Sequence, residues 1–201
     1  GYWMDWDNSY YTMSDENNYT IWLFLKKCHE NGWIYKGHDV MPWCTRCGAA
    51  LSEHEIATEG YREMTHASIT VRFPIDGRQN EYLLVWTTTP WTIPANLAIA
   101  VWPSFKYVAV QAGDRYFVVA QDLATSFLES CGLEEQHRVE VNAEKLEGRK
   151  YRHPLFGDRN EQDYRVWPAE HVTLEAGTGL VHTAPGHGAD DYRLGMQHGL
   201  D

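Results

Sequence analysis

The sequence predicts an α+β fold that is mainly β: a β-barrel-like or sandwich core with helical decoration, preceded by a helical stem and a zinc-knuckle half-site. Three observations predict it. The first sixty residues contain one segment of helical periodicity and one closely spaced cysteine pair. From about residue 65, short runs rich in β-branched and aromatic residues alternate with turn signals. Hydrophobic residues make up 43% of the 201 residues, which is enough for a packed core.

A helix is expected over residues 15–31. Ser14 can accept a backbone hydrogen bond at its start, and Glu16 lies at the positive end of the helix dipole. Apolar residues recur at helical spacing inside it; they are Ile21, Trp22, Leu25 and Cys28. Gly32 ends the pattern. The segment therefore predicts a helical stem.

Residues 1–62 are expected to form the stem or linker with the cysteine pair, and residues 63–201 the main domain. Eight segments of this domain predict short strands; they are 68–73, 81–87, 97–101, 107–110, 116–120, 138–141, 164–167 and 179–182. Turn signals such as Asp76-Gly77 separate several of them. Two further helices are expected, over residues 123–130 and 190–198.

Composition and charge exclude several classes of protein. Seventeen Lys and Arg face 28 Asp and Glu, a formal net charge of −11, so the chain is a poor stand-alone clamp for nucleic acid. The N-terminus lacks a starting Met and the features of a secretory signal, so it is interpreted as the start of an excised fragment. Three prolines break the longest uncharged stretch, residues 82–105, so no membrane span is expected. Four unevenly spaced cysteines indicate a reducing, cytoplasmic setting rather than a disulfide scaffold.

The first chemical motif is Cys44-x-x-Cys47-Gly48. Two thiolates separated by two residues can bind one zinc ion, and the glycine permits the tight turn around them. A structural zinc site needs four ligands, and the sequence holds no second such pair. Three interpretations stay open: half of a zinc site completed outside the chain, a complete site with a local histidine, or a redox pair or plain packing.

The second motif reads Trp86-Thr-Thr-Thr-Pro-Trp-Thr-Ile-Pro-Ala-Asn96. Its two prolines fix φ and remove backbone donors, so the chain between them must be a rigid loop at the end of a strand. The hydroxyls of Thr87, Thr88 and Thr89 can there bind a small polar substrate or a water molecule. The alternative interpretation is a purely structural turn.

The third motif reads Gly177-Thr-Gly-Leu-Val-His-Thr-Ala-Pro-Gly-His-Gly-Ala-Asp-Asp-Tyr192. A strand delivers His182 to a glycine-rich turn, and Asp190 and Asp191 begin a helix. Carboxylates suit a helix N-terminus, so both can be simple caps. A carboxylate held there can instead bind a ligand ammonium group, or the histidines and aspartates can bind a metal.

Taken together, the second and third motifs resemble the editing insertion, connective peptide 1, of the isoleucyl-tRNA synthetase family of class I enzymes. Residues 4–13 and the Trp-Cys-x-x-Cys-Gly knuckle resemble the stem that leads into that insertion. The resemblance covers essentially the whole chain. In the related valyl and leucyl families the threonine segment reads Thr-Thr-Arg-Pro, and the valyl family has a lysine at the position of His182. The family's two ATP-site signatures are absent from these 201 residues, so the chain is not expected to activate amino acids.

The resemblance implies a hydrolase that removes valine from mischarged isoleucine tRNA, with valyl-adenylate as a further candidate substrate. One methylene is worth about 1–3 kcal/mol in a hydrophobic pocket, a range for which isoleucyl-tRNA synthetase is itself the standard example. A second, smaller site that admits valine and excludes isoleucine therefore multiplies the discrimination. The candidate catalytic residues are Thr87, Thr88, Thr89, His182 and Asp191. The candidate substrate-binding residues are Trp86, Thr92, Asn96, Thr183, Gly186 and His187.

Within this expectation, Asp191 binds the α-ammonium group, and the bulk of His182 with the wall from Trp86 to Thr89 excludes the larger side chain. The threonines and backbone groups place water at the ester. No side chain is an obvious general base, and the family implies help from the terminal ribose hydroxyl. The expected partners are the valine-bearing 3′ end of the tRNA and the remainder of the synthetase.

No cofactor is expected for hydrolysis. A structural zinc bound by Cys44 and Cys47 is a candidate only where the family's second cysteine pair, beyond the insertion, completes it. Two competing hypotheses remain: a non-catalytic zinc-ribbon and β-barrel module that docks RNA, and a metal-dependent hydrolase that uses His182, His187 and Asp190.

Overall fold

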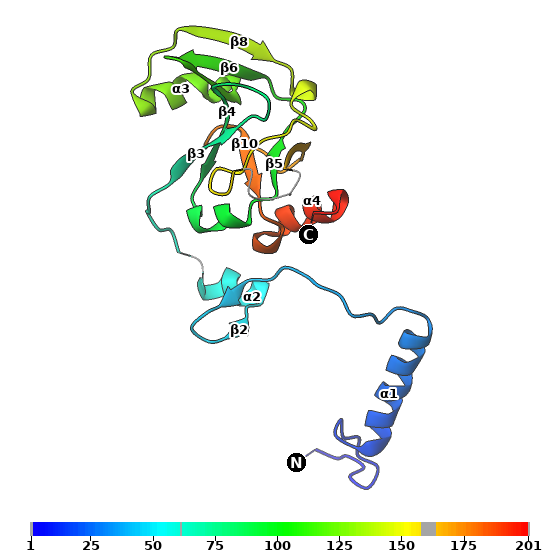
Figure 1. Ribbon diagram of the computed structural model, residues 1–201. Coiled ribbons are helices and arrows are strands. Elements are labelled where there is room, and N and C mark those ends of the chain that lie inside the picture. Colours follow the sequence, from blue (N-terminus) through cyan, green and yellow to red (C-terminus); the bar gives the residue numbers. More distant parts are fainter. Residues whose placement is uncertain (1, 61, 158–163, 201) are drawn as a thin grey trace. The chain divides into compact units, whose positions relative to one another are not determined.

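The computed structural model describes residues 2–60, 62–157 and 164–200 (Figure 1). The chain divides into two compact units, Gly1–Asp39 and Val40–Asp201. The division into domains expected after residue 62 rests on sequence pattern and stays a prediction.

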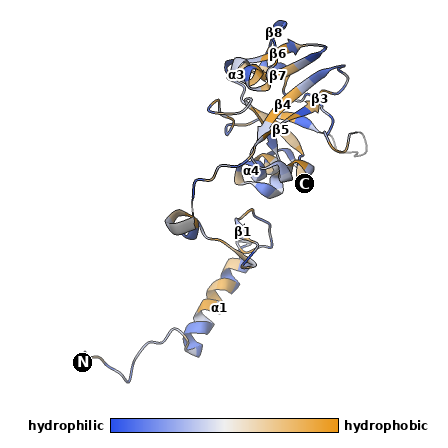
Figure 2. Ribbon diagram, turned by 90° about the vertical axis from the view of Figure 1, so that its left-hand side faces the viewer, coloured by the Kyte–Doolittle hydropathy of each residue, from blue (hydrophilic) through white to orange (hydrophobic). Residues whose placement is uncertain are grey.

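The first unit contains helix α1, Asp15–Glu30, which confirms the predicted helix. The side chain of Ser14 accepts a hydrogen bond from the amide of Asn17 at 3.3 Å, as a capping residue should. Among the helix residues only Cys28 is buried. Figure 2 shows hydrophobic residues along much of α1, and Trp22 and Phe24 are 69% and 64% exposed. Within its own unit, the apolar surface of this helix is therefore uncovered.

The second unit begins with a short hairpin of β1, Trp43–Cys44, and β2, Ala49–Ala50. Helix α2, Glu53–Glu55, follows with a capping box formed by Ser52 and Glu55, and the π-helix η1, Ile56–Gly60, continues from it. The hairpin places Cys44 and Cys47 at one turn, where the amide of Gly48 donates to the carbonyl of Cys44 at 2.8 Å.

Two open sheets form the body of this unit. The larger sheet has the order β3-β4-β7-β6-β8, with bounds Ile69–Pro74, Glu81–Thr87, Arg115–Ala120, Tyr107–Ala112 and His137–Val141. Only β4 and β7 pair in parallel; the other neighbours are antiparallel. The smaller sheet has the order β10-β5-β9, with bounds Leu180–Thr183, Ala98–Val101 and Arg165–Pro168. Here β5 pairs antiparallel with β10 and parallel with β9.

The α+β class with a mainly β core is confirmed, and each of the eight predicted strands is present. The barrel-like closure is wrong for the part of the chain that the structure describes, because its strands form separate ladders. The two sheets meet instead at Thr178. Its hydroxyl donates to the carbonyl of Leu84 at 2.6 Å, and its carbonyl accepts from the amide of Ala120 at 2.8 Å. One residue, just before β10, thus connects the smaller sheet to two neighbouring strands, β4 and β7, of the larger sheet.

The principal core lies between the two sheets. Its fully buried side chains come from both; they include Phe73, Leu83, Val85, Ile99, Val101, Tyr107, Val166 and Leu180. The hydroxyl of Tyr107 accepts from the amide of Trp102 at 2.9 Å and donates to the carbonyl of Gly179 at 3.0 Å. Burial raises the pKa of Tyr107 to about 12, so it keeps its proton at neutral pH.

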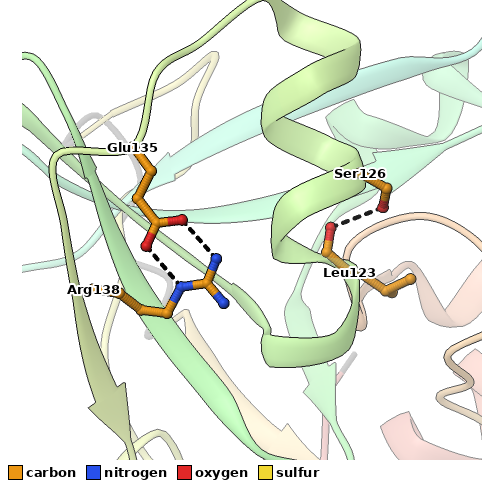
Figure 3. A network of polar contacts seen from close by, with 4 residues as sticks. All are labelled: Leu123, Ser126, Glu135 and Arg138. Atoms are coloured by element: carbon orange, nitrogen blue, oxygen red, sulfur yellow. Dashed lines mark hydrogen bonds and ion pairs between the residues drawn. The ribbon is translucent and has the colours of Figure 1, made fainter.

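Helices cover the outer faces of both sheets. Helix α3, Gln121–Cys131, packs Ala124 and Leu128 onto the far side of the larger sheet. Helix α4, Ala189–His198, packs Leu194 against β5 of the smaller sheet. After α3, the guanidinium of Arg138 bonds both oxygens of Glu135 at 2.8 and 2.6 Å, where the chain returns into β8 (Figure 3). Both predicted helices are therefore present, and α4 starts directly after the third motif.

Candidate functional site

The proline-rich motif forms the 3-10 helix η2, Pro90–Ala95, directly after β4. The predicted rigid, non-sheet segment is therefore confirmed. Pro90 lies in its first turn, where a backbone donor has no partner inside the helix, and Pro94 lies inside it, where the ring removes one backbone donor. Thr92 and Ile93 are buried by the turn, whereas Trp91 is 70% exposed.

Hydroxyl groups connect the end of β4 to η2. The hydroxyls of Thr87 and Thr89 lie 3.2 Å apart, and the amide of Thr89 donates to Thr87 Oγ1 at 3.0 Å. The hydroxyl of Thr92 donates to the carbonyl of Thr89 at 2.8 Å. Thr87 is buried, Thr88 is half-buried and Thr89 is exposed. The threonines thus run from the sheet to the surface.

The buried end of this arrangement is a contact between Thr92 and His182. Thr92 Oγ1 lies 2.9 Å from His182 Nε2, although the two residues are ninety positions apart. The single proton of the Thr92 hydroxyl is already donated to a carbonyl, which can only accept. The hydroxyl must therefore accept from His182, so Nε2 carries the proton and Nδ1 keeps its lone pair.

His182 is 8% exposed, and its chemistry follows from burial. Burial lowers its pKa, with smaller contributions in the same direction from His187 and His153, while the negative charge of Asp191 raises it. The net direction is down, so the ring is neutral at pH 7. Its Nδ1 atom is buried and has no hydrogen-bond partner among the residues that the structure describes. The ring presents bulk and one unused acceptor.

Asp191 lies in the first turn of α4. Its Oδ1 accepts a hydrogen bond from the amide of Ala184 at 2.8 Å, which links α4 to the end of β10. Its Oδ2 receives no hydrogen bond from any of the described residues, and the side chain is only half-buried. One oxygen is held while the other stays available for a cationic group. The neighbouring Asp190 is ion-paired on the surface with Arg193 at 2.5 Å.

A cavity of about 270 Å³ adjoins the end of β4. Trp86, Thr87 and Thr88 line it together with residues 171 and 173 and the segment 175–181. The Trp86 ring closes one side: a Cβ on Gly177, whose φ is +83°, would stand 3.0 Å from Trp86 Cε3. This pair brings the second and third motifs together in one wall. His182 and Asp191 are not among the described residues that line this cavity, and a substrate site shared by all of them stays a prediction.

The remaining predicted residues have different surroundings. Both polar groups of Asn96 are used within the protein: Nδ2 donates to the carbonyl of Ala98 at 2.7 Å, and Oδ1 accepts from Tyr151 at 2.6 Å. Thr183 is fully buried, with its hydroxyl unpartnered in the described part of the chain. Gly186 and His187 are exposed in the short 3-10 turn η4, Pro185–His187. Roles in substrate binding for these residues stay predictions.

Two residues that support η2 were missed as site residues. Tyr151 bonds Asn96, as above, and His153 Nε2 lies 2.9 Å from the carbonyl of Ile93. His153 Nδ1 accepts from the amide of Leu155 at 3.1 Å, so Nε2 carries the proton and donates. Nothing in the sequence near residue 151 signals this contact, because its partners lie 55 and 60 residues away.

The cysteine pair fits half of a zinc site. The amide of Cys47 points at Cys44 Sγ, 3.4 Å away, which is the turn geometry that a zinc knuckle uses. That bond lowers the pKa of Cys44, while the Cys44 sulfur raises the pKa of Cys47. In the described ranges no group of three or more His, Cys, Asp and Glu side chains is arranged to bind a metal. This geometry lends no support to a metal site of His182, His187 and Asp190.

Among the helices that the structure describes, none is long and apolar enough to cross a membrane.

Comparison with protein families gives one match to most of the chain. A family model described as "tRNA synthetases class I (I, L, M and V)" matches residues 1–160. The chain is 44% identical to the isoleucine–tRNA ligase of Thermococcus kodakarensis and 40% identical to that of Clostridium novyi. Both alignments cover 100% of this chain but only 20% and 19% of the relatives. The chain therefore spans about a fifth of the length of these curated relatives.

Two solved structures resemble this chain in fold. One described as GlLeuRS-CP1 has a TM-score of 0.55 at 20% identity and covers 67% of this chain and 66% of that chain. Another, the cytosolic leucyl-tRNA synthetase editing domain of P. knowlesi, has a TM-score of 0.50 at 14% identity and covers 62% and 60%. At these identities the likeness is one of fold.

Proposed function

Since the chain belongs to the class I tRNA synthetases, the family of the isoleucine, leucine, methionine and valine enzymes, we propose that it is the proofreading part of an isoleucyl-tRNA synthetase. It hydrolyses the ester of valine mistakenly attached to isoleucine tRNA, with valyl-adenylate as a further substrate. Identity of 40–44% to isoleucine–tRNA ligases over the whole chain, and the fold shared with leucyl editing domains, support the proposal.

One observation carries the proposal most directly: the carboxylate of Asp191 is half engaged. The Ala184 amide fixes one oxygen, and the other has no partner among the described residues. A hydrogen bond between a fixed carboxylate and an ammonium group is roughly twice as strong as a neutral one. Asp191 therefore anchors the α-ammonium group that every aminoacyl ester carries and a free tRNA end lacks.

His182 and the threonines define the rest of the site. The neutral, buried ring of His182 has its orientation fixed by Thr92, so it acts by volume and not by charge. A rigid ring rejects one extra methylene that flexible side chains would accommodate. Trp86, Thr87 and Thr88 line the neighbouring 270 Å³ cavity and supply the second wall of the proposed site.

Catalysis in this proposal comes from positioning a water molecule at the ester carbonyl. Thr87 and Thr89 supply hydroxyls that can hold a water molecule at the ester carbonyl, and backbone amides of the turns can stabilise the developing oxyanion. The buried histidine that contacts Thr92, His182, is neutral and keeps its acceptor nitrogen enclosed. The terminal ribose hydroxyl of the tRNA then assists the attack, and no metal takes part in the reaction.

The partners follow from the same proposal. The valine-bearing 3′ end of isoleucine tRNA enters the site, and the remainder of a longer synthetase in the cytoplasm grips the rest of the tRNA. That remainder covers the exposed apolar surface of α1 and completes a structural zinc site with Cys44 and Cys47.

Replacement of the anchor tests the proposal. Asp191→Asn keeps the size and the capability to accept from Ala184 but removes the charge, and we expect the single-turnover rate on valyl-tRNA to fall about tenfold or more. Glu175→Gln removes one negative charge from an exposed residue on the rim of the 270 Å³ cavity. Comparing the two variants separates loss of the anchor from a general change in the electrostatic potential of the site. Unchanged hydrolysis by Asp191→Asn would contradict the anchor. RNA binding without hydrolysis by the unaltered chain would favour a docking module.

A further inference from the structure

Gly188 is the residue just before α4, and its backbone does not require glycine. Its φ of −166° and ψ of 149° are extended values that any residue adopts. The residue also donates no side-chain cap to the helix that follows. A reason for glycine at this position must therefore be the space that a side chain would occupy.

The carboxylate of Asp191 occupies that space. A Cβ on Gly188 would overlap Asp191 Oδ2, and Asp191 Cγ would stand 3.2 Å from it. Because Oδ2 is the tip of a side chain that can rotate, the fold can accept a methyl group here, but the carboxylate must then move. Its other oxygen would move with it, away from the Ala184 amide that it contacts at 2.8 Å.

We propose that Gly188 is a positioning residue for the amine anchor: its missing side chain lets the carboxylate of Asp191 lie across the backbone, with Oδ1 on the Ala184 amide and Oδ2 directed at the substrate ammonium group. The inference rests on the proposed editing function and adds one residue to those that determine recognition of the substrate amine. It assigns Gly188 no contact with the substrate, since it acts through Asp191.

The test compares single-turnover hydrolysis of valyl-tRNA(Ile) by the unaltered chain and by Gly188→Ala. We expect the variant to be slower by about tenfold or more, and its thermal unfolding midpoint to fall no further than that of Asp191→Ala, because both variants lose the hydrogen bond from the Ala184 amide. Ala189→Ser is the matched control. It adds one heavy atom to the adjacent exposed residue, away from the carboxylate, and is expected to hydrolyse like the unaltered chain.

Two readouts separate positioning from a structural defect. The first is the rate on the ester of 2-hydroxy-3-methylbutanoic acid on the same tRNA, in which a hydroxyl replaces the amine. Gly188→Ala should hydrolyse this ester as fast as the unaltered chain does. The second is the double variant with Asp191→Ala, which should be no slower than Asp191→Ala alone, because Gly188 acts only through that carboxylate.

The inference is overturned if Gly188→Ala hydrolyses valyl-tRNA as fast as the Ala189→Ser control, or if it slows the hydrolysis of both esters equally. It is also overturned if the double variant hydrolyses valyl-tRNA more slowly than Asp191→Ala alone. Those outcomes leave the editing function standing, because the unaltered chain is active in each. Absence of valyl-tRNA hydrolysis by the unaltered chain is a different result, which overturns the proposed function and this inference together.

Discussion

Thr92 shows how one hydroxyl sets the state of the site. It donates to the carbonyl of Thr89 and accepts from His182 Nε2, so it decides which nitrogen of the buried ring carries the proton. This contact holds the His182 ring in one orientation. In sequence Thr92 is simply the fourth threonine of a motif, and only the folded chain gives it this task.

Replacing Thr92 with valine, which has nearly the same shape, tests that role. We expect the free energy of unfolding to fall by about 1–3 kcal/mol, because the buried Nε2–H of His182 loses its acceptor. We also expect a smaller ratio of valyl- to isoleucyl-tRNA hydrolysis, because the freed ring can turn. Urea unfolding and single-turnover rates measure both. Thr70→Val, the same change at an exposed residue of β3, should alter neither. An unchanged ratio in Thr92→Val would remove Thr92 from the specificity of the site.

The lowered pKa values of His182 and His153 predict how stability depends on pH. Burial is the largest cause for both, from a usual value of 6.5. Below that value the unfolded chain binds protons that the folded chain refuses, so stability is complete above about pH 6.5 and declines as the pH falls toward the folded pKa values. Urea unfolding at about pH 7.5 and about pH 5.5 should show this decline, and His182→Gln should reduce it. An equal decline in both proteins would show that His182 is not held neutral.

At the scale of elements, the site depends on how the ends of β4, β5 and β10 are brought together. Tyr107, at the start of β6, bonds the amide of Trp102 just after β5 and the carbonyl of Gly179 just before β10. Thr178 joins the same segment to β4 through Leu84. These bonds hold the strand that delivers His182 against the strand that ends in the threonines.

Tyr107→Phe should therefore destabilise the fold by about 1–3 kcal/mol, because it leaves one buried amide and one buried carbonyl without a partner while it preserves the ring. Tyr116→Phe is the control, since the Tyr116 hydroxyl bonds only the side chain of Gln111, at 3.1 Å, and both residues are half-buried. We expect the control to cost less than about 0.5 kcal/mol. Equal midpoints of urea unfolding for the two variants would show that Tyr107 does not join these strands.

At the scale of the whole molecule, the periodicity of hydrophobic residues and the positions of turn residues predicted the helices and strands well. The strand at Glu81–Thr87 matches its predicted bounds, and β6 extends past its prediction only by residues that continue the ladder with β7. These successes have a local cause, because periodicity and turn residues act over a few positions. The family resemblance also places the ends of β4 and β10 at a common substrate site, which stays a prediction.

Long-range pairing could not be predicted in the same way. Many short strands favour barrel-like closure, but the described strands form separate ladders that Thr178 connects through Leu84 of β4. The support of η2 by Tyr151 and His153 depends on contacts across 55 and 60 residues that no local pattern encodes. Asn96 has polar atoms suited to a ligand, and only the fold shows that the protein uses them itself.

The central claim is that one small site anchors an amine and excludes one methylene. It is tested most directly by single-turnover hydrolysis of isoleucine tRNA carrying either valine or isoleucine, with the unaltered chain in excess. We expect the valyl ester to be cleaved faster by roughly tenfold or more, and His182→Ala to narrow that gap by speeding cleavage of the isoleucyl ester. Equal rates on the two esters, or no cleavage of either, would contradict the account.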